Sequence, residues 1–212
     1  MTAKQVDKSH YEFAKYLHKR RWASIWHQLD EVLALDPHTV LEIGPGPGVF
    51  QAVAGRFGLK VETLDLDPGL KPDHVASADE MPFEDDAFDV VCAFQMLEHV
   101  PYEISLEIVA EMARVARKGL VISLPDASKC WSVTFFIPRV GTKSLLLREP
   151  RVRMPKHRYN GEHYWEVNKA GYSRSKILED FQHASKGHLR CDYRVNDNPY
   201  HRFFVYTFGA GR

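Results

Sequence analysis

The stretch from Thr39 to Val49 constrains the fold of this chain more than any other. It reads T-V-L-E-I-G-P-G-P-G-V, in which a short apolar run is followed by glycines at alternate positions, Gly44, Gly46 and Gly48. An apolar helical pattern begins directly after them. A backbone that turns sharply from a strand into a helix, and that lets a ligand approach closely, has no room for a Cβ atom. The stretch therefore predicts a strand, a tight glycine turn and a helix that together border a ligand site.

The ligand of this turn is predicted to lack phosphates. A dinucleotide fingerprint has the pattern Gly-x-Gly-x-x-Gly, whose last position is Val49 here. Pro45 and Pro47 have no N–H group, so the loop lacks two donors that would hold a pyrophosphate. Glu42, just before the first glycine, repels phosphate and favours a ligand with a positive end. S-adenosylmethionine carries an ammonium and a sulfonium and has no phosphate, so it matches this loop.

The run E-I-G-P-G-P-G resembles the first motif of the class I S-adenosylmethionine-dependent methyltransferases, and the chain is similar to their type 11 domain. The resemblance implies an α/β fold, a Rossmann-like, doubly wound, seven-stranded sheet. The sheet is expected to be mostly parallel with an antiparallel C-terminal strand, with N-terminal helices and an insertion after strand 5. It also implies that Glu42, Gly44, Gly46 and Gly48 bind the cofactor. A glycine-rich turn without a ligand is the alternative.

Two later stretches are expected to complete the cofactor site. Asp65 follows the second predicted strand, 21 residues after the first glycine. That spacing is close to the roughly 20 residues at which an acid meets ribose hydroxyls in a βαβ unit. The stretch that begins S-A-D resembles the family's adenine-binding loop, although Ser77 replaces the usual aspartate. The resemblance implies that Ser77, Ala78 and Asp79 lie beside the adenine.

The apolar run Phe88–Phe94 is followed by Q-M-L-E-H-V, which resembles the family's turn after the fourth strand. Ligands lie outside the carboxyl ends of strands in such sheets, so we expect Gln95 at the cofactor and Glu98 in the substrate pocket. His99 is a candidate general base, because an ordinary histidine pKa of roughly 6.5 suits proton removal; a histidine that only shapes the turn is the alternative. Some quinone-type O-methyltransferases carry Glu-x-x-Glu-His here and bind a divalent metal. Gln95 replaces the first ligand, so no metal is expected.

Residues 126–166 interrupt the alternation of strands and helices. Trp131 and its apolar neighbours precede seven basic residues between positions 139 and 158, against the single acid Glu149. One interpretation is a substrate-covering insertion that meets an anionic group, with Arg151 and Arg153 in the pocket. The other is a solvated loop.

The six residues G-E-H-Y-W-E at positions 161–166 combine two acids, a histidine and two aromatic residues. They resemble the stretch that lines the acceptor pocket in related methyltransferases. The resemblance makes His163 a candidate catalytic residue and places Tyr164 and Trp165 in the substrate pocket. An aromatic anchor that holds the insertion down is the alternative.

The chain is long enough for one well-buried domain and short for two. We therefore predict a single domain over residues 1–212. Hydrophobic spacing predicts further helices and an antiparallel strand pair, with Arg117-Lys118-Gly119 closing the second of these helices. The helices are expected at 11–35, 102–116 and 173–183, and the strands at 190–195 and 203–208. The segments are a helical part (1–36), a cofactor-binding core (37–125), a substrate-side insertion (126–166), and a final helix and strand pair (167–212).

Composition limits the partners. Lysine plus arginine equals aspartate plus glutamate, 28 against 28, so no global field favours nucleic acid. The three cysteines lack metal or disulfide spacing, and no run approaches the roughly 20 apolar residues of a membrane span. We expect a soluble, cytoplasmic methyltransferase without a signal peptide. Its expected acceptor is a small molecule or is glycan- or lipid-linked, the alternatives being RNA or tRNA methylation through the basic insertion and an inactive cofactor-binding scaffold.

Overall fold

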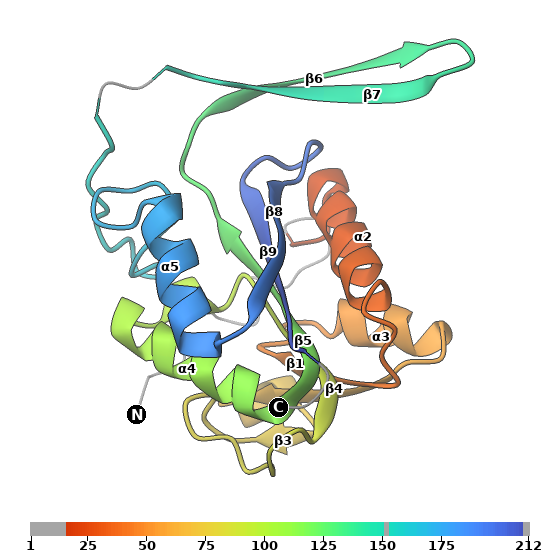
Figure 1. The fold of residues 1–212 in the computed structure, drawn as a ribbon, viewed down its shortest axis with the longest axis vertical. Helices are drawn as coiled ribbons and strands as arrows, with labels where there is room; N and C mark the ends of the chain where they lie inside the picture. Colours follow the sequence, from red (N-terminus) through yellow and green to blue (C-terminus); the bar gives the residue numbers. More distant parts are fainter. Residues whose placement is uncertain (1–15, 151–152, 210–212) are drawn as a thin grey trace.

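The computed structural model describes residues 16–150 and 153–209, which form a seven-stranded sheet with helices on both faces (Figure 1). The strand order is β3-β2-β1-β4-β5-β9-β8. The first five strands along the chain pair in parallel, and β9 runs antiparallel to both of its neighbours. The predicted Rossmann-like, doubly wound fold is confirmed. The strands are β1 (Thr39–Ile43), β2 (Lys60–Asp65), β3 (His74–Val75), β4 (Phe88–Phe94), β5 (Ala116–Pro125), β8 (His188–Arg194) and β9 (His201–Thr207).

Helices α2 and α3 cover one face of the sheet, and α4 and α5 cover the other (Figure 1). Neighbouring strand residues point to opposite faces, so Val90 and Phe203 join one core cluster while Val91 and Phe204 join the other. None of the helices in the described part of the chain has the length and apolar character needed to cross a membrane. The helices are α2 (Lys19–Leu33), α3 (Val49–Arg56), α4 (Tyr102–Val115) and α5 (Arg174–Ser185), with short 3-10 turns at Pro68–Leu70 and Leu97–His99.

The predicted ends of these helices are partly confirmed. Ser173 caps α5 as expected, because its hydroxyl accepts a hydrogen bond from the Lys176 N–H. The prediction for the end of α4 is wrong, since β5 begins at Ala116 without an intervening turn. Gly119 lies inside this strand, where an added Cβ would come within 2.3 Å of the Tyr206 carbonyl oxygen. This glycine therefore permits the close approach of β9 and does not end a helix.

The N-terminal segment is only partly described. The structure contains α2 where a helix was predicted, and Tyr16, just before it, is half-buried. The first part of the predicted helix, residues 11–15, lies outside the described residues. The polar edge of α2 reaches the C-terminal strands, because Asn198 Nδ2 donates to Ser24 Oγ at 2.9 Å and His27 Nδ1 lies 3.0 Å from the Tyr193 hydroxyl.

The carboxyl ends of the parallel strands lie at one edge of the sheet. In the ladder Ile43 is level with Leu64 on one side and with Ala93 on the other, and Ala93 is level with Ile122. The segments that follow these strands therefore gather at the same edge. They are the glycine turn, Asp65, the turn 95–99 and the chain from Asp126 onward.

The insertion after β5 forms a two-stranded antiparallel hairpin that extends beyond the body of the molecule (Figure 1). Its strands are β6 (Cys130–Ile137) and β7 (Gly141–Arg148). We predicted no strands here, although W-S-V-T-F alternates apolar and polar residues as a half-exposed strand does. The hairpin includes the first part of the basic stretch, up to Arg148, and residues 153–158 beyond it have no regular secondary structure.

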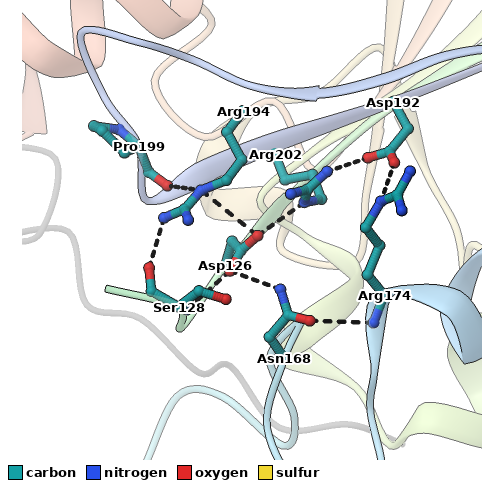
Figure 2. A network of polar contacts seen from close by, with 8 residues as sticks. All are labelled: Asp126, Ser128, Asn168, Arg174, Asp192, Arg194, Pro199 and Arg202. Atoms are coloured by element: carbon teal, nitrogen blue, oxygen red, sulfur yellow. Dashed lines mark hydrogen bonds and ion pairs between the residues drawn. The ribbon is translucent and has the colours of Figure 1, made fainter. Parts of the chain in front are cut away.

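A network of charged side chains fixes the end of β5 against the C-terminal strands and α5 (Figure 2). Asp126 is buried and accepts hydrogen bonds from Arg202 Nε at 2.8 Å and from Asn168 Nδ2 at 3.0 Å. Asp192 of β8 pairs with both Arg202 and Arg174. Because Asn168 follows closely on residues 161–166, the network also positions that stretch at the edge of the sheet.

Asp89 ties the start of β1 to β4. Its side chain is buried, and its Oδ2 accepts hydrogen bonds from the backbone N–H groups of His38 at 2.8 Å and Thr39 at 3.2 Å. Its Oδ1 accepts from Arg117 Nη2 at 2.6 Å. Burial alone would raise the pKa of Asp89, but Arg117 and the two amides outweigh it and hold the pKa well below its usual range.

We expect Asp89→Asn to lower the free energy of unfolding at pH 7 by about 1–3 kcal/mol, because these charge-assisted hydrogen bonds are weakened. The folded-state pKa is depressed, so this contribution is present above the unfolded-state pKa of roughly 3.9 and is lost as the pH falls through the folded-state pKa. Urea titrations at pH 7 and at pH 3 should show a smaller difference between variant and wild type at the lower pH. Glu179→Gln, at an exposed position of α5, is the matched control. An equal difference at both pH values would contradict this role.

Candidate functional site

The glycine turn has the backbone that the sequence predicts. Gly44, Gly46 and Gly48 have φ angles of +67°, +54° and +70°, a region that side chains other than glycine rarely adopt. An added Cβ on Gly44 would also lie 2.7 Å from the Cγ of Met96. The Gly44 N–H donates to the Leu64 carbonyl at 2.9 Å and ties the turn to β2.

Glu42 lies just before this turn and is buried. Its Oε2 has no hydrogen-bond partner among residues 16–150 and 153–209. Burial raises the pKa of Glu42 to about 8, against the opposing effect of the Gln51 backbone N–H. A buried carboxyl group with an unused acceptor oxygen is stabilised in its charged form by an approaching cation. Glu42 thus fits a ligand with a positive end, such as the ammonium of S-adenosylmethionine.

Asp65 and the 77–79 loop follow neighbouring strands. Asp65 ends β2 and pairs with Val75, the last residue of β3. Asp65 is half-buried, and burial raises the pKa of its carboxyl group. Ser77 donates a hydrogen bond to the Asp79 carboxylate, and Ala78 between them is half-buried. The structure therefore brings the predicted ribose and adenine residues to one part of the sheet edge.

Gln95 follows β4 with a φ of +55°. Its backbone N–H donates to the Ser123 carbonyl at 2.9 Å, and its side-chain Nε2 lies 3.3 Å from the Ser123 hydroxyl. The side chain is thus held toward β5. Its predicted contact with the cofactor stays a prediction.

A cavity of about 510 Å³ lies beside the glycine turn. It is lined by Gly46 and Gly48 together with Thr63 and the segment 69–72, but not by Asp65 or the 77–79 loop. The groups that fit ribose and adenine therefore lie outside this cavity. We take the site from the donor and acceptor chemistry at the strand ends and not from the size of the hollow.

The second half of the site contains two histidines from distant parts of the chain. The ring centroids of His99 and His163 are 5.0 Å apart in an edge-to-face arrangement. His99 Nδ1 lies 3.0 Å from the Glu162 carbonyl oxygen, which can only accept, so this nitrogen carries a proton. The backbone N–H of Tyr164 donates to the Glu98 carbonyl at 2.8 Å. The structure thus joins the turn after β4 to residues 161–166.

His163 is held by a carboxylate on one side of its ring. Its Nδ1 lies 2.9 Å from Glu166 Oε1, which also accepts a hydrogen bond from the Tyr200 hydroxyl at 3.0 Å. Lys169 Nζ lies 3.6 Å from the other oxygen of Glu166. Burial raises the pKa of Glu166, but His163, Tyr200 and Lys169 outweigh it and lower the pKa overall. Glu166 is therefore ionised and holds His163 with Nδ1 protonated and Nε2 as the atom that can accept a proton.

The pKa values of His163 and Glu98 both move toward the neutral range. Burial lowers the pKa of His163, but Glu166, Glu98 and Glu162 raise it above its ordinary value. Glu98 is fully buried, and neither of its carboxylate oxygens has a hydrogen-bond partner in the described chain. Burial raises the pKa of Glu98 to about 7, while His163 and Arg21 oppose the rise. Such shifted pairs are typical of functional sites.

Arg21 brings α2 into the same site. Besides Glu98, its charge acts on Tyr200 and on His201. The guanidinium lies 4.6 Å from the ring centroid of Tyr16. His201 is almost fully buried at the start of β9, where burial and the charges of Arg21 and His18 lower its pKa to about 3. It is therefore neutral at physiological pH.

Three side chains could hold a metal ion. Glu98, His99 and His163 each offer a ligand atom, and these atoms lie within 4.8 Å of one another. Nitrogen and carboxylate ligands suit several divalent metals. No metal was expected from the sequence, because Gln95 replaces a ligand of the quinone-type motif, but His163 supplies a third group that this motif does not include.

The other predicted pocket residues have mixed outcomes. The prediction for Trp165 is wrong: its side chain is 0% exposed and packs against the Tyr102 ring at 4.9 Å, within the core. Tyr164 is partly exposed and contacts Tyr159, with the two rings tilted and their centroids 4.8 Å apart. Arg153 is exposed, and Arg151 lies outside the described residues.

Sequence reasoning did not assign Arg21 or Tyr200 to the site. A single arginine in an amphipathic helix and a tyrosine in a turn-rich connection carry no pattern that indicates a site. The asparagine and proline residues beside Tyr200 are explained by turn chemistry alone. Their role emerges only when the C-terminal strand pair and α2 are brought to the carboxyl edge of the sheet.

Comparison with known proteins agrees with this geometry. A family model described as a methyltransferase domain matches residues 13–174. The ubiquinone biosynthesis O-methyltransferase of Hahella chejuensis is 29% identical over 153 residues, which cover 65% of this chain and 59% of that protein. An uncharacterized methyltransferase of Mycobacterium avium is 34% identical over 93 residues, which cover 38% of this chain and 36% of that protein. The chain thus spans less than two thirds of the length of these relatives.

Solved structures share the fold. The magnesium protoporphyrin IX methyltransferase of Synechocystis PCC 6803 with bound S-adenosylmethionine has a TM-score of 0.60 and 12% identity, covering 96% of this chain and 87% of its own. The glycopeptide N-methyltransferase MtfA in complex with S-adenosylhomocysteine has a TM-score of 0.55 and 10% identity, covering 88% and 89%. The family match, the strand order and the glycine turn together show that this chain belongs to the class I S-adenosylmethionine-dependent methyltransferases.

Proposed function

We propose that this protein transfers the methyl group of S-adenosylmethionine to a hydroxyl group of a small-molecule or of a glycan- or lipid-linked acceptor. The observation that carries the proposal is the His163–Glu166 pair, 2.9 Å between Nδ1 and Oε1, beside the buried Glu98. The name of the Hahella chejuensis relative, an O-methyltransferase of ubiquinone biosynthesis, supports an oxygen acceptor.

The residues of the first half of the site suit the cofactor. Glu42 would meet its ammonium, the glycine turn would permit its close approach, and Asp65 would accept from the ribose hydroxyls. The loop at 77–79 would border the adenine. When bound, the cofactor supplies a methyl group on a positively charged sulfur.

The residues of the second half suit the removal of a proton. Glu166 fixes the imidazole of His163 and stabilises its protonated form, so Nε2 can take the proton of an acceptor hydroxyl as the oxygen becomes nucleophilic. Tyr200 orients Glu166 in turn. Glu98, with a pKa of about 7, is a second titratable group next to His163. The charge of each group therefore changes when the other gains or loses a proton. The rest of the rate enhancement is expected from the proximity of acceptor and methyl donor and from a desolvated pocket.

The two alternatives fit these observations less well. An inactive scaffold has no need of a carboxylate-held histidine next to a second histidine, whereas a proton-accepting site does. Methylation of RNA would use the basic insertion, but the chain as a whole carries no excess of positive charge.

Isothermal titration with S-adenosylmethionine and S-adenosylhomocysteine tests the cofactor part. Wild-type protein is expected to bind both compounds, and Asp65→Ala is expected to weaken binding by about 1–3 kcal/mol, the usual cost of leaving buried polar groups unpaired. Asp30→Ala, at an exposed position of α2, is the matched control and should bind as the wild type does. An unchanged affinity would remove Asp65 from the site, and a wild type that binds neither compound would overturn the proposed function.

A further inference from the structure

The outer face of the β6–β7 hairpin is apolar and exposed. Directly opposite residues of an antiparallel pair lie on the same face, and Trp131 is opposite Leu147 while Val133 is opposite Leu145. Phe135 and Ile137 continue this face along β6. The exposed fractions of these six side chains run from 38% for Ile137 to 59% for Trp131. A soluble protein rarely leaves so continuous an apolar surface uncovered.

The opposite face of the hairpin is mostly polar and is linked to the body. Ser132 Oγ donates to the Asn196 carbonyl at 2.7 Å, in the connection between β8 and β9. Farther out, the hydroxyls of Thr134 and Ser144 lie 2.9 Å apart on the same face. The hairpin is thus an amphipathic element, and its apolar face is opposite to the face that contacts the body.

At the tip the apolar surface continues around both faces. Phe136 lies on the polar face, opposite Thr142, and is 71% exposed. Val140, in the turn between the strands, is 58% exposed. A flat protein partner would cover one face of a hairpin, whereas a tip with apolar side chains on all sides suits immersion in an apolar medium.

Positive charge gathers in the hairpin and in the stretch of chain that follows it. The stretch from Cys130 to Arg158 holds seven of the chain's 28 basic residues and one of its 28 acidic residues, so the rest of the chain has an excess of acid. Lys143 lies on the apolar face opposite Phe135, and Arg139 lies in the turn. Lysine and arginine can extend from an apolar surface to reach anionic head groups.

We propose that the β6–β7 hairpin docks on the surface of an anionic lipid bilayer, with its tip in the boundary between head groups and acyl chains. A second copy of this chain fits the apolar face less well, because two basic hairpins packed face to face would repel each other. Anionic lipid supplies both the opposite charge and the apolar medium.

Because of where the hairpin lies in the chain, its docking on a bilayer would also limit which acceptors reach the site. The hairpin is inserted in the chain between Asp126, at the end of β5, and the stretch 161–166, and both of these lie at the carboxyl edge of the sheet. A docked hairpin would therefore bring this edge of the sheet toward the bilayer. This part rests on the proposed function and narrows the acceptor to a lipid-linked or membrane-dissolved molecule with a hydroxyl group.

Co-sedimentation with vesicles tests the docking. Wild-type protein is expected to bind vesicles of equal parts phosphatidylglycerol and phosphatidylcholine, with weaker binding in high salt and to pure phosphatidylcholine. The double variant Phe136→Ser/Val140→Ser is expected to bind about tenfold less, because its tip loses apolar area. Phe57→Ser is the matched control, since Phe57 is 67% exposed at the end of α3, and it should bind as the wild type does.

A second variant separates charge from apolar contact. Arg139→Glu/Lys143→Glu is expected to lower binding to the anionic vesicles at least tenfold, at roughly fivefold for each lost charge, and to leave little salt dependence. Wild type that stays in solution with the anionic vesicles would overturn the proposal. So would a concentration-dependent dimer in light scattering that the Phe136→Ser/Val140→Ser variant abolishes, because that result would assign the face to a second copy. Isothermal titration of the same variants with S-adenosylmethionine keeps a failure of docking distinct from a failure of the proposed function.

Discussion

His163→Ala is expected to lower kcat by about 10²–10⁴-fold while the affinity for S-adenosylmethionine stays within a factor of two or so, because the variant loses the proton acceptor and leaves the glycine turn intact. Rates with the acceptor, measured beside isothermal titration of the cofactor, check both parts. His188→Ala, at an exposed position of β8, is the control and should keep full activity. A His163→Ala enzyme with wild-type kcat would exclude His163 as the base.

The pH dependence of the methyl-transfer rate gives a second test of His163 as the base. The folded-state pKa of His163 is raised above 6.5, so the neutral form that accepts a proton is complete only above that raised pKa. The rate should therefore increase with pH through a midpoint above 6.5 and then level off. Glu166→Gln removes a charge that raises the pKa, so its midpoint should lie at lower pH and its kcat should fall. Repeating the profile with EDTA shows whether Glu98, His99 and His163 act through a bound metal.

Asp126→Ala is expected to have the largest effect on stability, a loss of about 3–5 kcal/mol in the free energy of unfolding. The variant leaves the buried guanidinium of Arg194 without a carboxylate and leaves Arg202 with Asp192 alone, and a buried charge that loses its partner is costly. The side chains of Asp126 and Arg202 are 0% and 3% exposed. Arg194 would keep its hydrogen bond to the Pro199 carbonyl at 2.6 Å.

Chemical denaturation followed by circular dichroism measures this loss. Asp197→Ala, at an exposed position in the connection between β8 and β9, should change stability by less than about 0.5 kcal/mol. Because the network also positions Asn168, the Asp126→Ala protein is expected to lose activity at temperatures where it remains folded. A variant as stable as the wild type would show that the network in Figure 2 is not required for the fold.

The cofactor half of the site could be predicted from sequence because its signals are local. Gly44, Gly46 and Gly48 adopt positive φ angles, which glycine adopts far more readily than other residues. The pattern of alternate glycines can therefore be recognised within a few residues of sequence. Asp65 is placed by the length of one strand–helix–strand unit, which varies little. The parallel, doubly wound core followed from the alternation of apolar runs and helical patterns, and the antiparallel C-terminal strand followed from the resemblance to the methyltransferase family.

The acceptor half could not be predicted in the same way. Its contacts join residues far apart in sequence, such as His99 with His163 and Glu166 with Tyr200. Trp165 was assigned to the pocket because the stretch 161–166 resembles a pocket-lining segment of related methyltransferases, yet its side chain is fully buried and packs against Tyr102 in the core. The hairpin was missed because its alternating apolar face is exposed, whereas strand prediction assumes that such a face is buried.

A crystal structure with S-adenosylhomocysteine tests the central claim most directly. The account predicts that the ribose hydroxyls lie within hydrogen-bond distance of Asp65, that the ammonium lies at Glu42 and the glycine turn, and that Nε2 of His163 faces the sulfur across the acceptor space. Density for the ligand in the cavity lined by Gly46, Thr63 and residues 69–72, with Asp65 uninvolved, would contradict it.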